Sequence, residues 1–477
     1  MCPLEIFLAA LTASAGACLW IGRWQRTERL LTCTALVAAV AHEIFEGAYW
    51  QMLPACIATG TLCFVAWKPG ICRKRLRTFT ALSALLLVTM SVLFSFLLPI
   101  FRLPAPTGNY PVGTSILYFK DSTRIEDAAS AEGATRELMV QLWYPAQLSH
   151  NPLASYRELR ETDTLSSYQS VIPTNSHLDA PVAIEGAPFP VILFNHAWGG
   201  RRTNDTFLTE ELASHGYIVA SIDHTYNARL VAFPDGRVVH GIAANDIDIP
   251  EISTAERVKA IWNMELTKWV ADQRFILDRL EAMNRTAATP WFGRLDTDRS
   301  GAIGHSFGGA AATALCAEDA RVHASVNMDG WFFNAIRVRG PNQPLLVIDA
   351  YTGQVGKISD SEGKVEAALD STDFVDMEAS LHRFGGYLLS VKGASHEDFT
   401  DQPLVSPLQK LSHRGELPAQ RIQGIVRTYV VAFFDKTLRD EDPEVLRTHP
   451  SPYAEVSLDT WPASKSEIVS SIRYEGR

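Results

Sequence analysis

The sequence has very little cysteine outside its first hundred residues. Of its seven cysteines, six lie at or before Cys72, and the remaining one is Cys316. We therefore expect no disulfide framework, which would need paired cysteines throughout the fold. Internal repeats and low-complexity tracts are also absent from the 477 residues. Cys316 falls in an alanine-rich stretch, which favours a small core residue.

Clustered positive charge is missing from most of the chain. Residues after 104 carry 34 Lys or Arg and 49 Asp or Glu, whereas residues 1–104 carry nine and four. Because phosphate binding needs clustered Lys and Arg, this acidic part argues against a nucleic-acid partner. The contrast, together with a length beyond what one core usually fills, indicates separate domains. We expect domains over residues 1–104 and 105–440, and a C-terminal extension over residues 441–477.

Long uncharged apolar runs are confined to the first domain. Phe79–Ile100 is long enough to span the hydrocarbon core of a bilayer as a helix. Ile6–Gly22 and Met52–Trp67 are shorter and milder, and Leu30–Trp50 begins apolar but contains charged residues. We expect an all-α transmembrane region of about four helices, in which the second helix is the weakest.

Basic residues predict how these helices are oriented. The segments Arg23–Arg29 and Lys68–Arg77 separate the first run from the second and the third from the fourth. By the positive-inside rule both segments face the cytoplasm, which a four-span arrangement satisfies. The protein is then a multi-pass membrane protein, and everything after Phe101 lies on the extracytoplasmic side. The first run is not typical of a secretory signal, because its positive charges follow it.

Three polar residues interrupt the second run, namely His42, Glu43 and Glu46. Ionisable groups at membrane depth are costly, so one interpretation is an intramembrane functional site. The other is that the helix ends near Ala41 and the three residues lie in interfacial water. We favour the second interpretation, because Tyr49 and Trp50 beside them are typical of the membrane interface.

Beyond a linker at Arg102–Pro111 the pattern changes to short apolar runs that alternate with helix-like segments. The runs are Ser115–Phe119, Leu138–Tyr144, Pro190–Asn195, Tyr217–Asp223, Ser300–Ile303, Val322–Met328, Leu345–Ile348 and Tyr387–Val391. The helix-like segments are Thr206–His215, Thr254–Met283, Phe307–Glu318 and Gln420–Asp435. This alternation predicts an α/β fold with a mostly parallel eight-stranded sheet, covered by helices on both faces. In such sheets ligands bind at the carboxyl ends of the strands.

The stretch GAIGHSFGGAA, residues 301–311, places one serine between two glycines. In a nucleophile elbow, G-x-S-x-G, the serine lies on a strained turn from a strand to a helix, and the glycines avoid collisions there. A short apolar run precedes Ser306, and small helix-forming residues follow it. The context that the motif requires is therefore present, and Ser306 is a candidate nucleophile.

A nucleophilic serine needs a base, an acid that orients the base, and backbone donors for an oxyanion. Among thirteen histidines, only His396 follows the last predicted strand within a short loop. Asp329 follows the sixth strand and Asp349 follows the seventh, and the order along the chain does not separate these two acids. The third strand leads into a loop of small residues that offers backbone donors.

Six ordered stretches resemble those of a known family. They are GNYPVGT (Gly108–Thr114), VILFNHAWGGRRT (Val191–Thr203), ELASHGYIVASIDH (Glu211–His224), AIGHSFGGAA (Ala302–Ala311), VNMDGW (Val326–Trp331) and SVKGASHEDF (Ser390–Phe399). Together they resemble the plasma and type II platelet-activating factor acetylhydrolases and their bacterial relatives. The resemblance covers roughly residues 105–435.

The resemblance implies an α/β-hydrolase fold and an enzyme that removes short or oxidised acyl groups from phospholipids. It implies no calcium or other metal and no cofactor, and a lipid or small ester as the substrate. Ser306 would be the nucleophile, Asp329 the acid and His396 the base. The family has no acid at the position of Asp349, which favours Asp329. The reaction would proceed in two steps through an acyl-enzyme.

One departure from the family lies in the loop after the third strand. Where the family has S-H-G-L-G, this chain has Asn195, His196, Ala197, Trp198 and Gly199. The backbone N–H groups of Trp198 and Phe307 would then bind the oxyanion, and the indole of Trp198 could narrow the acyl pocket. The multi-span N-terminal region has no counterpart in the soluble members of the family.

Two other classes of function stay open. One is a carboxylesterase or lactonase that acts on small esters other than lipids. The other is a membrane sensor or scaffold whose hydrolase-like domain is inactive. The complete set of nucleophile, acid, base and elbow glycines argues against an inactive domain.

Two further segments could border the site. Trp331, Phe332 and Phe333 follow the acid and could line an acyl pocket, although we favour ordinary core aromatics on the next helix. Asn227–Asp248 contains the turn signal PDG between apolar runs, which predicts a hairpin near the site.

Overall fold

The computed structural model describes residues 2–22, 25–47, 49–68, 74–129, 133–242, 255–332, 343–351, 375–406 and 415–462. The chain divides into two compact units. The bundle unit consists of Met1–Arg102, Ser155–Pro173 and Gln402–Ser412. The sheet unit consists of Leu103–Ala154, Thr174–Asp401 and His413–Arg477.

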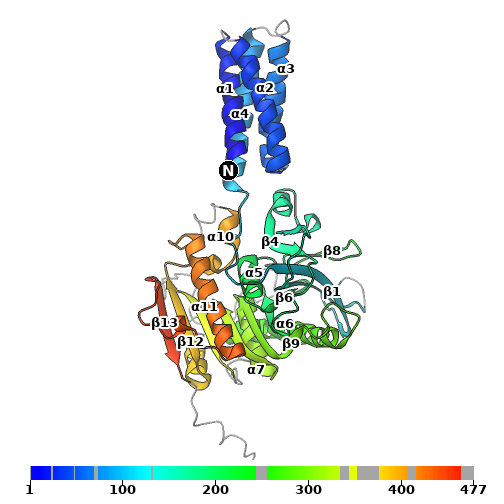
Figure 1. Ribbon diagram of the computed structural model, residues 1–477, viewed down its shortest axis with the longest axis vertical. Coiled ribbons are helices and arrows are strands. Elements are labelled where there is room, and N and C mark those ends of the chain that lie inside the picture. The colour runs from blue at the N-terminus through cyan, green and yellow to red at the C-terminus, as the bar shows by residue number, and fades with distance from the viewer. Residues whose placement is uncertain are drawn as a thin grey trace, which may run out of the picture. The chain divides into compact units, whose positions relative to one another are not determined.

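Four helices form the core of the bundle unit (Figure 1). They are α1 (Pro3–Ile21), α2 (Gln25–Phe45), α3 (Leu53–Trp67, after the 3-10 turn η1 at Trp50–Met52) and α4 (Lys74–Leu97). Small residues such as Ala15, Ala58 and Ala84 are buried where the helices meet, and the Thr12 and Thr59 hydroxyls lie 2.7 Å apart. Large apolar side chains point outward instead, as Phe79 does. This arrangement, with small residues inside and bulky apolar residues outside, is typical of helices that pack within lipid.

Three segments of the bundle are long and apolar enough to cross a membrane: Pro3–Ile21, Trp50–Trp67 and Lys74–Leu97. The helix α2, which we expected as a fourth span, is not among them in the described part of the chain. Arg26, Glu28 and Arg29 lie in its first turns, and charged groups lower the mean hydropathy of the helix. The prediction of four transmembrane helices therefore holds by length and composition for three of them.

The favoured interpretation of the polar residues on α2 is wrong in one respect. The helix does not end near Ala41 but continues to Phe45. His42 is fully buried, its ring lies edge-on to Tyr49 at 5.2 Å, and Glu46 accepts a hydrogen bond from the backbone N–H of Leu4. Helix packing against α1 and η1 thus encloses this end of α2, which the sequence of α2 alone does not reveal.

Two later segments of the chain pack with the helices of the bundle unit. The first contains the 3-10 turns η3 (Leu159–Glu161) and η4 (Ser167–Val171), and the second contains α10 (Gln402–Val405). Trp50 Nε1 donates to the carbonyl oxygen of Leu165, and Ser406 Oγ donates to that of Leu97 at 2.6 Å. The bundle unit is therefore built from three separate stretches of sequence.

The sheet unit contains one large sheet whose described strands number eleven. They are β1 (Val112–Ile125), β2 (Thr135–Pro145), β3 (Leu153–Ser155), β4 (Pro173–Leu178), β5 (Phe189–Asn195), β6 (Ile218–Asp223), β9 (Leu295–His305), β10 (Val322–Met328), β11 (Leu345–Tyr351), β12 (Gly386–Lys392) and β13 (Val456–Trp461). Their spatial order is β13-β12-β11-β10-β9-β5-β6-β2-β1-β4-β3. The prediction of eight strands is wrong in number, because β3, β4 and β13 extend the two edges. None of these three carries a long apolar run.

Six neighbouring strands, from β6 through β5, β9, β10 and β11 to β12, run parallel, and β2 is antiparallel to both β1 and β6. Central strands of this kind are buried on both faces, which explains why β5 and β6 are buried along their whole length. The α/β-hydrolase class predicted from the sequence agrees with this mostly parallel sheet.

Helices cover both faces of the sheet (Figure 1). They include α5 (Thr206–Ser214), α6 (Ala255–Arg285), α7 (Phe307–Glu318) and α11 (Ala419–Arg439). Along β9, Gly301 faces Phe434 of α11, whereas Ala302 belongs to the apolar core that includes α6 and α7. Successive residues of a strand point to opposite faces, so α11 lies on one face and α6 and α7 on the other. Cys316 is buried in that same core, as expected, and burial raises the pKa of its thiol to about 12.

Candidate active site

Ser306 is the single residue between a strand and a helix. The strand β9 ends at His305, and α7 begins at Phe307. A Cβ atom on Gly304 would lie 2.3 Å from the backbone of Gly308, and one on Gly308 would lie 2.3 Å from the carbonyl oxygen of Asn195. Ser306 itself has φ 55° and ψ −124°, a conformation that side chains rarely adopt. The local geometry is that of a nucleophile elbow, and both flanking glycines are sterically required.

His396 and Asp329 are in direct contact. His396 begins the 3-10 turn η6 (His396–Phe399) after β12, and its Nδ1 lies 2.6 Å from Asp329 Oδ2. Burial alone lowers the pKa of His396, but the hydrogen bond and charge of Asp329 outweigh it and raise that pKa above its usual value. Conversely, His396 helps to hold the pKa of Asp329 below its usual value in spite of burial. The pair has the arrangement of a base oriented by an acid.

The backbone holds Asp329 in place against the neighbouring strand. Its N–H donates to the carbonyl oxygen of Ile348, and its Oδ1 accepts from the N–H of Ala350 at 2.9 Å. Asp329 has φ 56°, and the glycine after it is in close contact with the elbow. A Cβ atom on Gly330 would lie 2.1 Å from the carbonyl oxygen of Ser306. The loop that carries Asp329 is therefore packed directly on the elbow at Ser306.

His396, the predicted base, also lies beside the elbow. His305 Nε2 donates to the carbonyl oxygen of His396 at 2.8 Å, and the two imidazole rings are 4.5 Å apart. Both Ser306 and His396 are among the described residues, and no hydrogen bond joins their side chains. Contacts of this kind are often loose without substrate and become shorter in the reacting complex. The three predicted site residues, Ser306, Asp329 and His396, are thus brought to one edge of the sheet.

Asp349, the alternative acid, lies next to Asp329. The strands β10 and β11 are parallel, and Met328 pairs with Ile348, so the following residues are neighbours. The Asp349 carboxyl makes a side-chain hydrogen bond with Asp329, and burial together with the charge of Asp329 raises the pKa of Asp349 to about 6. Because Nδ1 of His396 contacts Asp329, the geometry supports Asp329 as the acid.

The two predicted oxyanion donors belong to adjoining elements. Trp198 lies in the loop after β5, Phe307 is the first residue of α7, and their rings pack edge to face at 5.4 Å. The Trp198 ring also packs against Trp262 at 5.1 Å, and its Nε1 donates to the carbonyl oxygen of Ile242. None of the described residues accepts a hydrogen bond from the backbone N–H of Trp198. This N–H is therefore available to a ligand.

A buried polar network behind this loop was not predicted from the sequence. Asp272 of α6 accepts two hydrogen bonds from Arg136, at 3.0 and 2.6 Å, and lies 2.8 Å from His224. Burial alone would raise the pKa of Asp272, but the charge of Arg136 and these hydrogen bonds hold it well below its usual range. A signal was present, because His224 comes directly after a strand that ends at the site. Its partner Asp272 has no such signal, since it lies within a long helix.

The two segments expected to border the site, residues 331–333 and 227–248, agree in part with what the sequence predicts. Phe332 is 1% exposed and belongs to the core, and Trp331 packs against it, which agrees with core aromatics. Neither residue is helical, however, so the expected helix does not begin there, and Phe333 lies outside the described residues. The strands β7 (Leu230–Ala232) and β8 (Val238–His240) form the predicted hairpin, and residues 243–248 of that segment also lie outside the described part.

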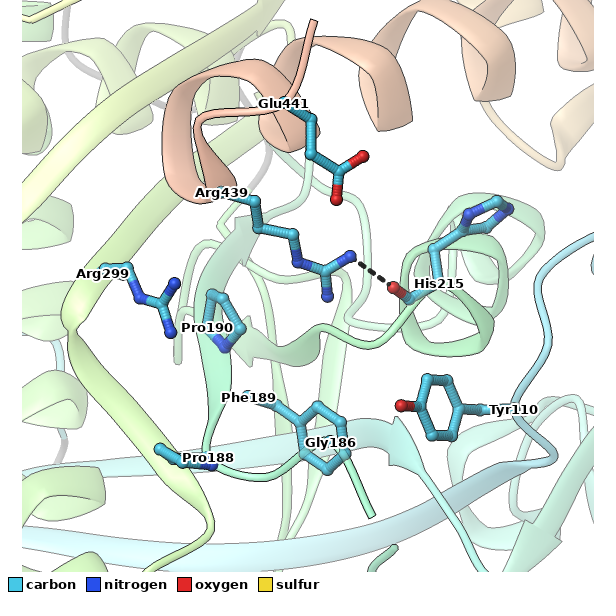
Figure 2. A pocket seen from close by; sticks show the side chains of 9 residues that line it. All are labelled: Tyr110, Gly186, Pro188, Phe189, Pro190, His215, Arg299, Arg439 and Glu441. Carbon is cyan, nitrogen blue, oxygen red and sulfur yellow. Dashed lines mark hydrogen bonds between the residues drawn. The ribbon is translucent and has the colours of Figure 1, made fainter. Parts of the chain in front are cut away.

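A separate pocket of about 290 Å³ lies at the amino end of β5 (Figure 2). It is lined by Tyr110, Gly186, Pro188, Phe189, Pro190, His215, Arg299, Arg439 and Glu441. The Arg439 guanidinium donates to the carbonyl oxygens of His215 and Gly216, and Figure 2 shows the bond to His215. These bonds hold the two residues that follow α5 in place. The candidate site lies at the carboxyl ends of the strands instead. In the described ranges, no group of three or more His, Cys, Asp or Glu side chains could hold a metal ion.

Comparison with known proteins gives a consistent result. Residues 99–445 match the family model of platelet-activating factor acetylhydrolase, isoform II. A probable 1-alkyl-2-acetylglycerophosphocholine esterase of Arthroderma benhamiae is 25% identical over 71% of this chain and 81% of that protein. The platelet-activating factor acetylhydrolase of Canis lupus familiaris is 24% identical over 61% of this chain and 72% of that protein. The structure of a ferulic acid esterase from Streptomyces cinnamoneus is similar with a TM-score of 0.60 and 30% identity, over 75% of this chain and 99% of that one.

Proposed function

Because the chain belongs to the platelet-activating factor acetylhydrolase isoform II family, we propose that it is a membrane-anchored serine ester hydrolase. Its substrates are phospholipids that carry short or oxidised acyl groups, and it cleaves them through an acyl-enzyme. The esterase names of its relatives support ester hydrolysis as the activity. The observation that carries the proposal is the contact of His396 with Asp329 beside a serine held in an elbow.

In the first step, His396 takes the proton of Ser306 while Ser306 Oγ attacks the ester carbonyl. Asp329 accepts the Nδ1–H of His396 at 2.6 Å, which leaves Nε2 unprotonated and stabilises the imidazolium that forms. The backbone N–H groups of Trp198 and Phe307 bind the negative oxygen of the tetrahedral intermediate. His396 then protonates the leaving alcohol, and Ser306 keeps the acyl group.

In the second step, water replaces the alcohol. His396 takes a proton from the water, whose oxygen attacks the acyl-enzyme, and the same backbone donors bind the new oxyanion. Collapse of this intermediate returns the proton to Ser306 and releases the acid. No cofactor enters either proposed step.

The bundle unit supports a lipid substrate. Three of its segments are long and apolar enough to cross a bilayer, so an enzyme anchored by them works beside its substrate. The basic segments around residues 23–29 and 68–77 favour the cytoplasmic side for those two loops and the extracytoplasmic side for the sheet unit. This orientation is part of the proposal.

A carboxylesterase that acts on small esters other than lipids is the second candidate. The similarity to a ferulic acid esterase favours it, because the matched region covers 99% of that esterase. The indole of Trp198 beside the proposed oxyanion hole also favours a narrow acyl pocket, which suits small acyl groups in either candidate.

Activity of the detergent-solubilised protein separates the two candidates. Phospholipids with sn-2 acyl groups of increasing length are compared with a panel of short p-nitrophenyl esters and aromatic esters. The proposal predicts a higher kcat/KM on short-chain phospholipids, a fall as the acyl chain lengthens, and no activity for Ser306→Ala. Activity on the small esters without any on phospholipids would instead assign the second candidate.

A further inference from the structure

A chain of buried polar side chains connects α6 to the loop that would bind the oxyanion. Asp272 Oδ2 lies 2.8 Å from His224 Nδ1, and His224 Nε2 lies 3.1 Å from Asn195 Oδ1. All three residues are fully buried. Asn195 ends β5, so the chain of contacts reaches the residue at which the loop with Trp198 begins.

Asn195 also connects this chain to the elbow. Its Nδ2 donates to Gln273 Oε1 at 2.8 Å and to the carbonyl oxygen of Ile303 at 3.2 Å. Gln273 Nε2 in turn donates to the carbonyl oxygen of Ala311 on α7 at 3.0 Å. Asn195 therefore contacts β9 directly and α7 through Gln273. Ser306 lies between these two elements, and Phe307 is the first residue of α7.

The next residues of the loop are held by the same group of side chains. The backbone N–H of His224 donates to His196 Nε2, and His196 Nδ1 donates to the carbonyl oxygen of Ala197 at 2.6 Å. Trp269 stacks on the His224 ring at 3.8 Å and donates to Asn227 Oδ1. The carbonyl oxygen of Asn227 accepts from the N–H of Gly199 on the far side of Trp198.

Charged side chains hold Asp272, the member of this series of contacts that lies farthest from the loop with Trp198. Arg136 donates to both oxygens of Asp272, and Arg124 Nη1 lies 2.8 Å from Asp272 Oδ1. A buried carboxylate with three charged or polar partners has one stable position, because any displacement leaves a charge without its hydrogen bonds. The carboxylate thereby fixes the imidazole of His224, and the imidazole fixes Asn195.

We propose that Asp272, acting through His224 and Asn195, is a positioning residue that sets the backbone N–H of Trp198 against that of Phe307. The inference rests on the proposed esterase function, since it assigns the network to the oxyanion hole of that reaction. None of the three side chains touches the substrate. They act on the transition state by holding donors whose loss lowers kcat more than it raises KM.

His224→Phe tests the proposal, because phenylalanine keeps the stacking on Trp269 and removes both polar contacts. We expect kcat on the preferred ester to fall about tenfold or more, with KM changed less than about twofold. The affinity for a trifluoromethyl ketone that mimics the tetrahedral intermediate should fall by the same factor as kcat. Glu126→Gln is the matched control, because Glu126 bonds Arg136 at the outer end of the network and does not contact His224.

A second variant tests the same proposal if His224→Phe does not fold. Asn195→Ala leaves the contact between Asp272 and His224 intact. It removes the contact of Asn195 with His224 and those with Gln273 and Ile303, so it should show at least the same loss of kcat and of ketone affinity. Equal changes in kcat and KM, or a lower melting temperature with unchanged kinetics, would overturn the positioning role. Failure of the proposed function is a distinct result, in which the unmodified protein and Ser306→Ala show the same rate.

Discussion

At the residue scale, the candidate site is marked by backbone conformations that side chains rarely adopt. Ser306 and Asp329 both have positive φ, at 55° and 56°. Each is held by its backbone N–H, which donates to Met328 in one case and to Ile348 in the other, at 2.8 Å. Strain of this kind persists only where the surrounding structure enforces it, and it concentrates at functional sites. Two of the three residues that the sequence pattern selected as a triad thus belong to the few described residues other than glycine that have positive φ.

Asp329→Asn should separate the charge of the acid from its shape. The amide cannot fix the reactive tautomer of His396, so we expect the rate to fall by about three to four orders of magnitude. Because Asp329 raises the pKa of His396 and the base must be neutral, the acid limb of the residual kcat/KM should move to lower pH. The measurement is kcat/KM against pH. Asp459→Asn, an exposed position on β13, is the control and should change neither quantity.

Asp349 should reduce stability at neutral pH. Its folded pKa is raised to about 6 by burial and by Asp329, so the folded protein holds this proton more tightly than the unfolded chain does. The penalty is absent below the unfolded pKa and grows as the pH rises through the folded one. Asp349→Asn should therefore raise the free energy of unfolding by about 1–2 kcal/mol near pH 8 and have little effect near pH 4. Equal effects at both pH values in denaturant titrations would contradict this assignment.

At the element scale, the sequence predicted the parts of the fold that are buried on both sides. Strands β5 and β6 are buried along their whole length, and β9 is buried from Ser300 onward, because helices cover both faces of the sheet there. Strand β4, which lies next to the edge strand β3 and has the sequence PTNSHL, shows no such pattern, since it is only partly buried. Patterns of apolar residues record burial, and they carry little information where burial is slight.

The same limit explains what was missed at the site. Ser306, Asp329 and His396 follow strands, and the carboxyl ends of parallel strands meet at one edge, so their proximity could be inferred. Asp272 lies on α6, whereas its partners Arg124, Arg136 and His224 come from β1, from β2 and from the residue after β6, and no local pattern relates them. Whether two buried groups meet depends on how the helix packs on the sheet, which a single sequence does not specify.

Gly308→Ala should be strongly destabilising although it improves helix propensity. A Cβ atom there would lie 2.3 Å from the carbonyl oxygen of Asn195 and 2.4 Å from that of His196. Both obstacles are backbone atoms, so the elbow and the oxyanion loop would have to separate. We expect a loss of activity and of several kcal/mol of stability, at the upper end of what single substitutions cost.

Gly424→Ala on α11 is the matched control for that substitution. Nothing lies within 4 Å of a Cβ atom at this position, so helix propensity alone acts. We expect a gain of about 0.5–1 kcal/mol in the free energy of unfolding and unchanged activity. A tolerated Gly308→Ala with normal kinetics would show that the elbow does not need the close approach.

At the scale of the whole molecule, two kinds of environment are encoded in one chain. The bundle unit has apolar residues facing outward and small residues inside, whereas the sheet unit buries its apolar residues in a core between helices and strands. The contrast in charge between residues 1–104 and the remainder predicts this division. It does not predict that residues 155–173 and 402–406 pack with the helices, because those segments are short and far along the chain.

The full chain should behave as an integral membrane protein. Three segments that are long and apolar enough to span a bilayer cannot leave it without exposing their apolar surface. After expression in cells, the protein should stay in the membrane fraction through an alkaline carbonate wash. Protease added outside intact cells should degrade the sheet unit if it lies on the extracytoplasmic side. Release by carbonate would contradict membrane anchoring, and protection from the protease would reverse the proposed orientation.

Covalent labelling of Ser306 tests the central claim most directly. A fluorophosphonate reacts with a serine only where a base activates the hydroxyl and an oxyanion hole accepts the phosphoryl oxygen. The detergent-solubilised protein is labelled, its intact mass is measured, and the modified peptide is identified. The account predicts one adduct per chain, located on Ser306, with no adduct in Ser306→Ala and a much slower reaction in Asp329→Asn. A folded protein that stays unlabelled, or is labelled equally after Ser306→Ala, would contradict it.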